Sequence, residues 1–251
     1  MSQWPQDDLS RDAFLGGALH LWQPKRGYRA GVDPVLLAAS VRAQSGQCIL
    51  DLGCGAGAAA LSLGTRVPGL RLFGVEQHVD YADLARRNGA HLAFEVHTGD
   101  VSDMPAALRA LSFDHVIANP PYYCRTTGTA APDPARETAL GEATPLSEWI
   151  SAGTKRLKPK GFLHMILKAD RLADALRACK SPLGSIEIIP FAPRVGRAAE
   201  LIIVRARKEG RAALKLHAPI VLHEGAEHTE DGIDYAQEIL DVLRHGKAIS
   251  T

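Results

Sequence analysis

The chain is poor in cysteine and contains no long apolar run. Its 251 residues include four cysteines, at positions 48, 54, 124 and 179, with no C-x-x-C pair. This argues against a disulfide framework or a zinc site and favours a reducing cytoplasm. No stretch approaches the roughly 18 apolar residues that a membrane span needs. The acidic N-terminus, MSQWPQDDLSRDAF, lacks the apolar core of a secretory signal, so we expect a cytoplasmic protein.

Histidine spacings typical of metal sites are also missing. The chain has ten histidines, and the closest candidate is HEGAEH, which contains His223 and His228. This segment does not have the H-E-x-x-H spacing that places two imidazoles on one helical face. We therefore expect no bound metal.

Charge is nearly balanced, but the two signs are unevenly distributed. The net charge is +1, yet residues 155–215 hold fifteen Lys or Arg against five Asp or Glu. Such a chain can present a basic face to a polyanion while it stays neutral as a whole. The alternative is that these basic residues simply form a solvent-exposed face of helices.

The pattern along the chain predicts an α/β protein with a mostly parallel sheet. Short apolar runs alternate with helix-like segments of about ten residues, which is typical of βαβ units. The predicted strands are Cys48–Leu52, Leu70–Val75, Phe94–Thr98, Phe113–Ala118, Phe162–Leu167, Ile186–Phe191 and Leu201–Arg205. The predicted helices are Ala58–Leu63, Val79–Asn88, Asp103–Leu111, Leu146–Leu157 and Arg171–Cys179, and Asp33 would cap a further helix through Pro34–Ala39.

These elements suggest three parts. Residues 1–47 form a lead-in, residues 48–210 a core, and residues 211–251 an extension packed on that core. No full helix fits between the last two strands, so we expect them to form an antiparallel pair at a sheet edge. The segment Arg125–Thr144 is rich in Thr, Ala, Pro and Gly and predicts a long functional loop.

A glycine-rich loop follows the first core strand. The segment Asp51-Leu52-Gly53-Cys54-Gly55-Ala56-Gly57 allows a tight turn and lets a ligand approach the backbone. Glu76 ends the second strand, where a carboxylate can accept hydrogen bonds from both hydroxyls of a ribose. The loop also fits the G-x-G-x-x-A fingerprint of nicotinamide dinucleotide enzymes, so it does not by itself choose a cofactor.

The third strand ends in Thr98-Gly99-Asp100-Val101. Asp100 could accept a hydrogen bond from the exocyclic amine of a cofactor adenine. Alternatively, it could simply cap the helix that follows.

The fourth strand ends in the motif that points to chemistry, Asn119-Pro120-Pro121-Tyr122-Tyr123. The prolines hold Asn119 and Pro120 in extended conformations. The Asn119 side chain and the Pro120 main chain each offer a carbonyl acceptor, and two converging acceptors can hold both hydrogens of an amino group. Tyr122 adds an aromatic face for a flat substrate.

The chain resembles the class I S-adenosyl-L-methionine-dependent methyltransferases that act on amino groups, because it contains, in this order, DLGCGAG, GVEQ, GD and NPPYY. The resemblance implies a Rossmann-like fold. Motifs in the lead-in narrow the resemblance further. Leu15-Gly16-Gly17, QPKRGYR and DPVLLA look like the bacterial valine-tRNA adenine-N6 methyltransferases, which modify the base beside the anticodon. Similarity continues into the back of the chain, at Ile189-Pro190-Phe191-Ala192-Pro193.

The resemblance implies roles for individual residues. Asn119, Pro120 and Tyr122 would be catalytic, and Pro121, Tyr122, Tyr123, Arg29 and Asp33 would bind substrate. The lead-in from Arg29 to Asp33 would fold over the methionine end of the cofactor. The cofactor-binding residues would be Asp51, Gly53, Gly55, Gly57, Glu76, Gln77, Asp100, Val101 and Asn119.

We therefore expect N6-methylation of an adenine in RNA, with tRNA as the favoured partner. A carboxamide nitrogen would satisfy the same two acceptors, so N5-methylation of a protein glutamine is the alternative. DNA adenine methylation would normally require a separate base-reading domain, which is not evident in this sequence. A binding module without turnover has no use for paired acceptors, and no hydride-transfer site follows the fourth strand.

Overall fold

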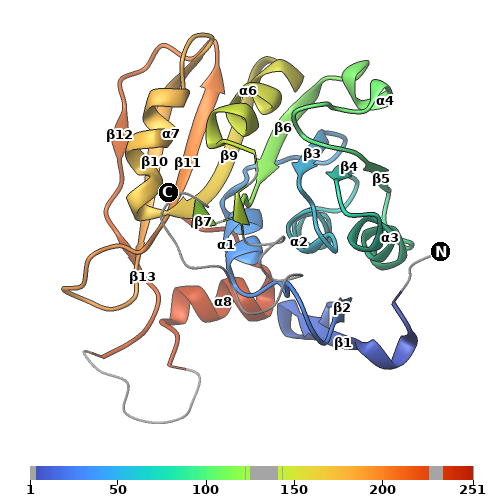
Figure 1. Cartoon of the computed structure of the whole chain (residues 1–251). Helices are drawn as coiled ribbons and strands as arrows, with labels where there is room; N and C mark the ends of the chain where they lie inside the picture. The colour runs from blue at the N-terminus through green and yellow to red at the C-terminus, as the bar shows by residue number, and fades with distance from the viewer. Residues whose placement is uncertain (1–3, 122, 125–140, 143, 226–233, 251) are drawn as a thin grey trace.

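A computed structural model describes residues 4–121, 123–124, 141–142, 144–225 and 234–250 (Figure 1). Tyr122 and most of the loop predicted over Arg125–Thr144 lie outside these residues. In the described part of the chain, no helix is both long and apolar enough to cross a lipid bilayer.

A single large sheet forms the centre of the molecule. All seven predicted strands belong to it, and two strands of two residues each extend it to nine. The strands are β3 (Cys48–Leu52), β4 (Arg71–Glu76), β5 (Phe94–Thr98), β6 (Phe113–Ala118), β9 (Leu157–Lys168), β10 (Leu183–Ala192), β11 (Leu201–Lys208), β12 (Lys215–Leu216) and β13 (Ile220–Val221). Their order is β12-β10-β11-β9-β6-β3-β4-β5, and β13 also pairs with β10.

The sheet is mostly parallel, as predicted. Only β11 runs against its neighbours, because it pairs antiparallel with both β10 and β9. The predicted antiparallel pair near the edge is therefore confirmed, with β12 and β13 added beyond it along β10.

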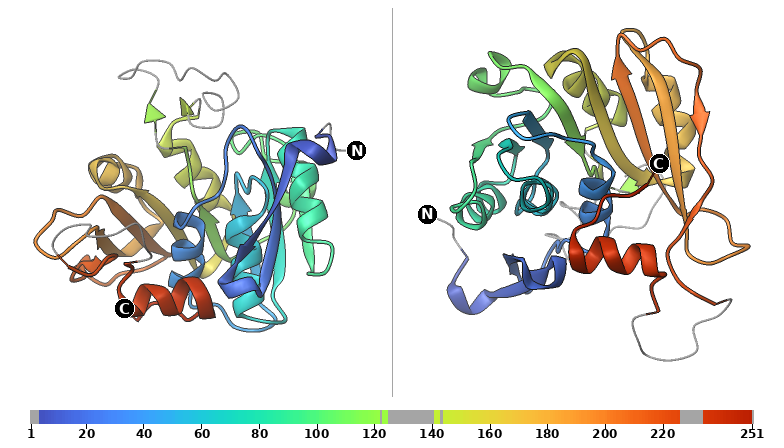
Figure 2. Two further views of the ribbon diagram at one scale, coloured as in Figure 1. Left: turned by 90° about the horizontal axis from the view of Figure 1, so that it is seen from below. Right: turned by 180° about the vertical axis from the view of Figure 1, so that it is seen from behind.

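Helices cover both faces of the sheet (Figure 2). The α-helices are α1 (Asp33–Ser40), α2 (Ala58–Arg66), α3 (Val79–Asn88), α4 (Ala106–Arg109), α6 (Leu146–Arg156), α7 (Leu172–Ala178) and α8 (Gln237–His245). Two predictions were inaccurate here. The residue at the N-cap of α1 is Val32, so Asp33 lies in the first turn. The helix predicted over Asp103–Leu111 is only the single turn α4.

In the central strands, alternate residues face the two layers of helices. On β3, for example, Ile49 packs in the cluster that contains α1 and α2, whereas Leu50 and Leu52 pack in the cluster that contains α6. All three side chains are fully buried. Burial on both faces explains why these strands appear in the sequence as continuous apolar runs rather than as alternating patterns.

The lead-in contains a β-hairpin that was not predicted. Strands β1 (Leu9–Phe14) and β2 (Leu19–Pro24) pair antiparallel, and the short helical turn η2 (Leu15–Gly17) joins them. The side chain of Asn88, at the end of α3, accepts a hydrogen bond from Trp22 N and donates to Trp22 O. The guanidinium of Arg87 lies 4.1 Å from the centre of the Trp22 ring. These contacts hold the hairpin against α3.

Both ends of the chain share the main core. Leu19 and Leu21 of β2 belong to the same cluster as Ile239 and Val242 of α8. The backbone N–H of Ile249 donates to Ala39 O at the end of α1. Strand β2 and helix α8 therefore pack in the same core cluster, although they come from opposite ends of the chain.

Candidate active site

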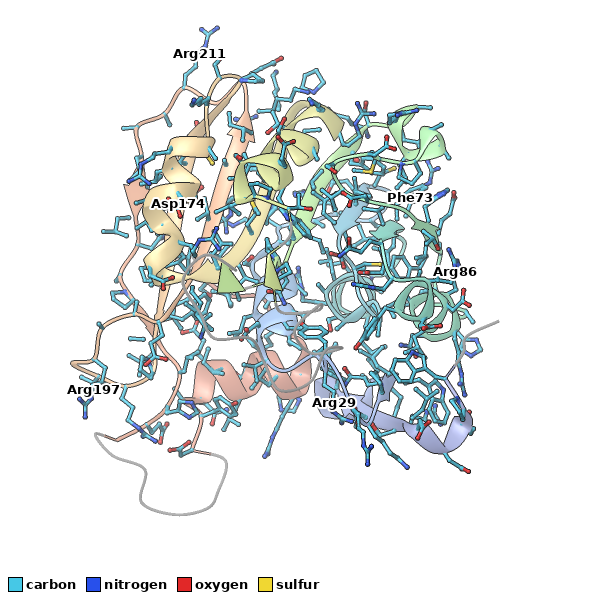
Figure 3. The ribbon with its side chains drawn as sticks, in the orientation of Figure 1. Arg29, Phe73, Arg86, Asp174, Arg197 and Arg211 are labelled. Carbon is cyan, nitrogen blue, oxygen red and sulfur yellow. The ribbon has the colours of Figure 1, made fainter. Side chains whose placement is uncertain are left out.

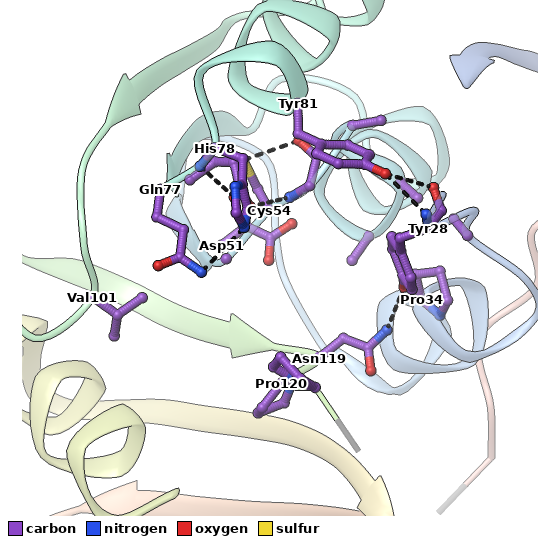
Figure 4. A pocket seen from close by; sticks show the side chains of 18 of the residues that line it. Tyr28, Pro34, Asp51, Cys54, Gln77, His78, Tyr81, Val101, Asn119 and Pro120 are labelled. Atoms are coloured by element: carbon purple, nitrogen blue, oxygen red, sulfur yellow. Dashed lines mark hydrogen bonds between the residues drawn. The ribbon is translucent and has the colours of Figure 1, made fainter. Parts of the chain in front are cut away.

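A cavity opens where the parallel strands β3, β4 and β6 end (Figure 4). Its volume is about 1090 Å³ when the open mouth is included. This is the position at which open α/β sheets bind ligands, because the loops after neighbouring parallel strands meet there. Ten residues predicted from the sequence line it: Asp51, Gly53, Gly55, Glu76, Gln77, Asp100, Val101, Asn119, Pro120 and Pro121.

Of the other predicted residues, Gly57, Arg29 and Asp33 are not part of this lining. Gly57 has φ of +90° at the start of α2, which accounts for glycine there without a ligand. Arg29 lies on the lead-in, where it forms an ion pair of 2.8 Å with Asp12. Asp33 is also outside the lining, although its charge contributes to raising the pKa of Tyr28, which is part of it. Tyr123 is described only as part of the short strand β7 (Tyr123–Cys124), which pairs with β8 (Gly141–Glu142).

The glycine loop turns sharply under an aromatic ring. Gly53 has φ of +61°, and a Cβ at that position would lie 2.5 Å from Cη2 of Trp149 on α6. Only glycine satisfies both the backbone conformation and the close approach of the indole. At Gly55 the surroundings are open, because a Cβ there would meet only Tyr28 Cε1, at 3.9 Å. The loop therefore presents exposed backbone to the cavity at Gly55.

Glu76 connects this loop to the next helix. One carboxylate oxygen accepts from Gly55 N and the other from His78 N, each at 2.9 Å. The residue is 6% exposed and faces the cavity. A carboxylate held in this way has remaining lone pairs that can accept hydrogen bonds from a ligand.

Asp51 lies beneath the loop as a buried carboxyl. Burial is the main reason that its pKa rises from 3.8 to about 8, and the negative charge of Glu76 raises it further. A hydrogen bond from Ala60 N, at 3.2 Å, opposes the shift. In the ligand-free protein, Asp51 is therefore largely protonated at neutral pH.

Asp100 is fixed by its own turn. Its Oδ1 accepts hydrogen bonds from the backbone and the hydroxyl of Ser102, at 2.7 and 2.6 Å. Helix α4 begins only at Ala106, so Asp100 does not cap it.

Asn119 lies at the end of β6 and reaches into the same cavity. Its Nδ2 donates to the hydroxyl of Tyr28 at 3.4 Å. The backbone of Tyr28 is fixed in turn by Tyr81 of α3, whose hydroxyl accepts from Tyr28 N at 2.9 Å and donates to Tyr28 O at 3.1 Å. With its nitrogen turned toward Tyr28, the Asn119 amide can direct its oxygen elsewhere (Figure 4).

Several lining residues were missed by the sequence analysis. Gln23 and Tyr28 come from the lead-in, Tyr81 from α3 and Trp149 from α6. Gln23 is almost fully buried and accepts a hydrogen bond from Ala30 N at 2.7 Å. For Tyr28, the only indication in the sequence is that it lies within the QPKRGYR motif. The positions of Tyr81 and Trp149 depend on how the helices pack.

The glycine loop after β3, Glu76 at the end of β4 and Asp100 after β5 line one cavity at the edge of a Rossmann-like sheet. The chain belongs to the methyltransferase small domain family, whose model matches residues 31–187. The fold and this membership identify the protein as a class I methyltransferase.

Individual relatives agree with this assignment. A tRNA1(Val) (adenine(37)-N6)-methyltransferase from Porphyromonas gingivalis is 34% identical, over 66% of this chain and 69% of the relative. A release factor glutamine methyltransferase from Burkholderia pseudomallei is 35% identical, but over only 42% of this chain and 39% of its own length. The crystal structure of a predicted O-methyltransferase from Agrobacterium tumefaciens superposes with a TM-score of 0.71 at 27% identity, covering 87% of this chain and 99% of that one.

Proposed function

We propose that the protein transfers a methyl group from S-adenosyl-L-methionine to N6 of an adenine in RNA, with tRNA as the substrate. The observation that carries the proposal is that Asn119 and Pro120 line the same cavity as Gly53, Gly55 and Glu76. A group held by the loop can therefore face a group held by the Asn-Pro corner.

The residues present fit the cofactor. Glu76 offers a fixed carboxylate to ribose hydroxyls, and Gly55 offers backbone that no Cβ covers. Asp51 offers a carboxyl that ionises readily beside a cation, which suits the positively charged methionine end. Bound S-adenosyl-L-methionine supplies an electrophilic methyl group on a sulfonium.

The Asn119–Pro120 corner would activate the target nitrogen. The N6 amine of adenine is planar, because its lone pair is delocalised into the ring. Hydrogen bonds from its two N–H groups to Asn119 Oδ1 and Pro120 O would draw the nitrogen toward tetrahedral geometry. These bonds strengthen as positive charge develops on the nitrogen, so they stabilise the transition state more than the ground state. The extra proton leaves after the new C–N bond has formed, so no strong base is needed before the attack.

The relatives support adenine over glutamine. The tRNA methyltransferase from Porphyromonas gingivalis aligns over 177 residues, whereas the glutamine methyltransferase aligns over 111. The alternative substrate, a glutamine side chain in a protein, would use the same two acceptors.

The test is to incubate the protein with isotopically labelled S-adenosyl-L-methionine and total bacterial tRNA. Mass spectrometry of the digested nucleosides should find the label in N6-methyladenosine. A parallel incubation with bacterial proteins covers the alternative. Label in glutamine, with none in tRNA, would overturn the substrate assignment.

A further inference from the structure

We propose that the groove between α6 and α7 binds the phosphate backbone of the RNA substrate as the strand leaves the active site. This inference rests on the proposed function and extends it to a surface outside the cavity. The groove has a volume of about 1850 Å³ when its open side is included, and it runs along both helices, from Pro145 to Lys155 on one side and from Arg171 to Pro182 on the other.

Helical spacing places polar groups along both walls. On α6, Ser147, Ser151 and Lys155 recur every four residues and therefore share one face. On the other wall, Arg171 and Arg177 are followed by Lys180 and Ser181. Hydroxyls together with Lys and Arg are the side chains that most often contact RNA phosphates and sugars.

The basic side chains of residues 155–215 are not all available to bind a ligand, because many of them have partners within the fold. Arg205 is buried and pairs with Glu187 at 3.2 Å. Lys158 pairs with Asp114 at 2.8 Å, and Lys208 donates to two backbone carbonyls of residues 154 and 157. The charges that remain for a ligand are therefore fewer than the sequence suggests.

Two of those remaining charges lie in the groove. Lys155 and Lys180 are both exposed; Lys155 lies in the last turn of α6, and Lys180 follows the end of α7 at Ala178. Asp174 lies on α7 (Figure 3). Its charge is neutralised locally, by Arg177 at 2.7 Å and Arg171 at 3.4 Å. Glu148 is the other acid, and it lies in the first turn of α6. On α6, the acid of the groove therefore lies in the first turn and the lysine in the last.

Helix α6 connects the groove to the active site. Trp149 and the preceding Thr144 line the cavity, whereas Ser147 and Ser151 line the groove. An eleven-residue helix is about 16 Å long. A strand with its target base in the cavity could therefore pass the start of α6 and follow the helix to Lys155.

The composition of the groove favours a nucleic-acid backbone over a protein. Among the residues that the structure describes, none of those lining the groove is aromatic. Protein interfaces depend on aromatic anchors, and sites that stack bases need aromatic faces. Cations and hydroxyls without aromatics suit a chain of phosphates, recognised independently of base sequence.

The experiment compares the wild type with the Lys155→Glu/Lys180→Glu variant. Binding of a fluorescein-labelled single-stranded oligoribonucleotide and of total tRNA is measured over a series of salt concentrations. We expect the variant to bind RNA at least about tenfold more weakly at low salt. The slope of log affinity against log salt should fall by about one or two, because phosphate contacts are lost. Affinity for S-adenosyl-L-methionine should not change.

The matched control is Lys215→Glu, which reverses an exposed lysine on β12 outside the groove. The proposal that the groove binds RNA is overturned if the double variant binds RNA as the wild type does or if the control weakens binding equally. It is also overturned if polyglutamate competes as well as RNA does. The proposed function fails separately, if the wild-type protein places no methyl group in RNA.

Discussion

The hydroxyl of Tyr28 and the amide nitrogen of Asn119 lie 3.4 Å apart in the cavity, although the two residues are far apart in the sequence. Tyr28 comes from the lead-in, and its backbone is fixed by Tyr81. Its pKa is raised, mainly by burial, so the phenol stays protonated. Tyr28 can therefore hold the Asn119 amide in one orientation, with its nitrogen toward the phenol.

Removing that hydroxyl should reduce turnover. One hydrogen bond is worth roughly 0.5–1.5 kcal/mol, so Tyr28→Phe should lower kcat about three- to tenfold, with cofactor affinity nearly unchanged. The measurement is steady-state kinetics with tRNA, together with calorimetric titration of the cofactor. In an Asn119→Ala background, Tyr28→Phe should have no further effect, since both changes remove the same oriented oxygen. Tyr235→Phe, outside the cavity, is the control.

Gly53 should not tolerate a larger residue. In Gly53→Ala the new methyl would lie 2.5 Å from Trp149, on a backbone with φ of +61°. We expect a loss of about 1–3 kcal/mol in stability and a cofactor affinity at least about tenfold lower. Thermal unfolding and calorimetry measure the two effects. Gly46→Ala separates strain from packing, because Gly46 has φ of +87° but no neighbour within 4 Å of a Cβ. Equal losses in both variants would show that Trp149 is irrelevant.

Cofactor affinity should depend on pH through Asp51. The pKa of this carboxyl is about 8 in the ligand-free protein, and a cationic ligand favours its ionised form. Binding should therefore release a proton, and the affinity should rise between about pH 6 and pH 8. In Asp51→Asn the pH dependence over this range should disappear. Calorimetry in buffers of different ionisation enthalpy measures the proton directly.

The same residue should affect stability. Because the pKa in the folded state lies above the unfolded value near 3.8, the stability that Asp51 contributes at low pH is lost as the pH rises toward about 8. The ligand-free Asp51→Asn protein should therefore gain stability relative to the wild type across that window. A constant difference between the two unfolding curves from pH 4 to pH 8 would contradict the assigned pKa.

A buried histidine pair should make the protein sensitive to acid. His115 Nδ1 and His164 Nε2 lie 3.1 Å apart, and burial lowers both pKa values, that of His115 from 6.5 to about 4. The pair therefore stabilises the fold above pH 6.5, and this contribution is lost as the pH falls toward 4. Thermal unfolding should show a shallower decline over this range in His164→Leu. Exposed His20→Gln should decline as the wild type does.

Much of the fold was predictable because the strands are buried on both faces. Strands β3, β5 and β6 begin and end where the sequence predicts; β3 and β6 are mostly buried, whereas β5, at the sheet edge, buries only Val96. The hairpin of the lead-in was missed, although Leu19, Leu21 and Gln23 alternate with more exposed residues on β2. That alternation is short and follows closely after the Gly16-Gly17 pair, which interrupts the pattern.

The site was predictable where its residues follow a strand directly. Gly53, Glu76, Asp100 and Asn119 all come immediately or closely after a parallel strand, so strand order alone brings them to one edge. Tyr81 and Trp149 could not be predicted in this way. Each lies inside a helix, and its place in the cavity is set by tertiary packing that no local pattern records.

The central claim is that Asn119 acts on the target amine, and Asn119→Ala tests it most directly. Turnover on tRNA should fall by about 10²–10³-fold, comparable to losing one transition-state hydrogen-bonding group. Calorimetry should show cofactor affinity largely intact. Labelled N6-methyladenosine formed at the wild-type rate by this variant would contradict the account.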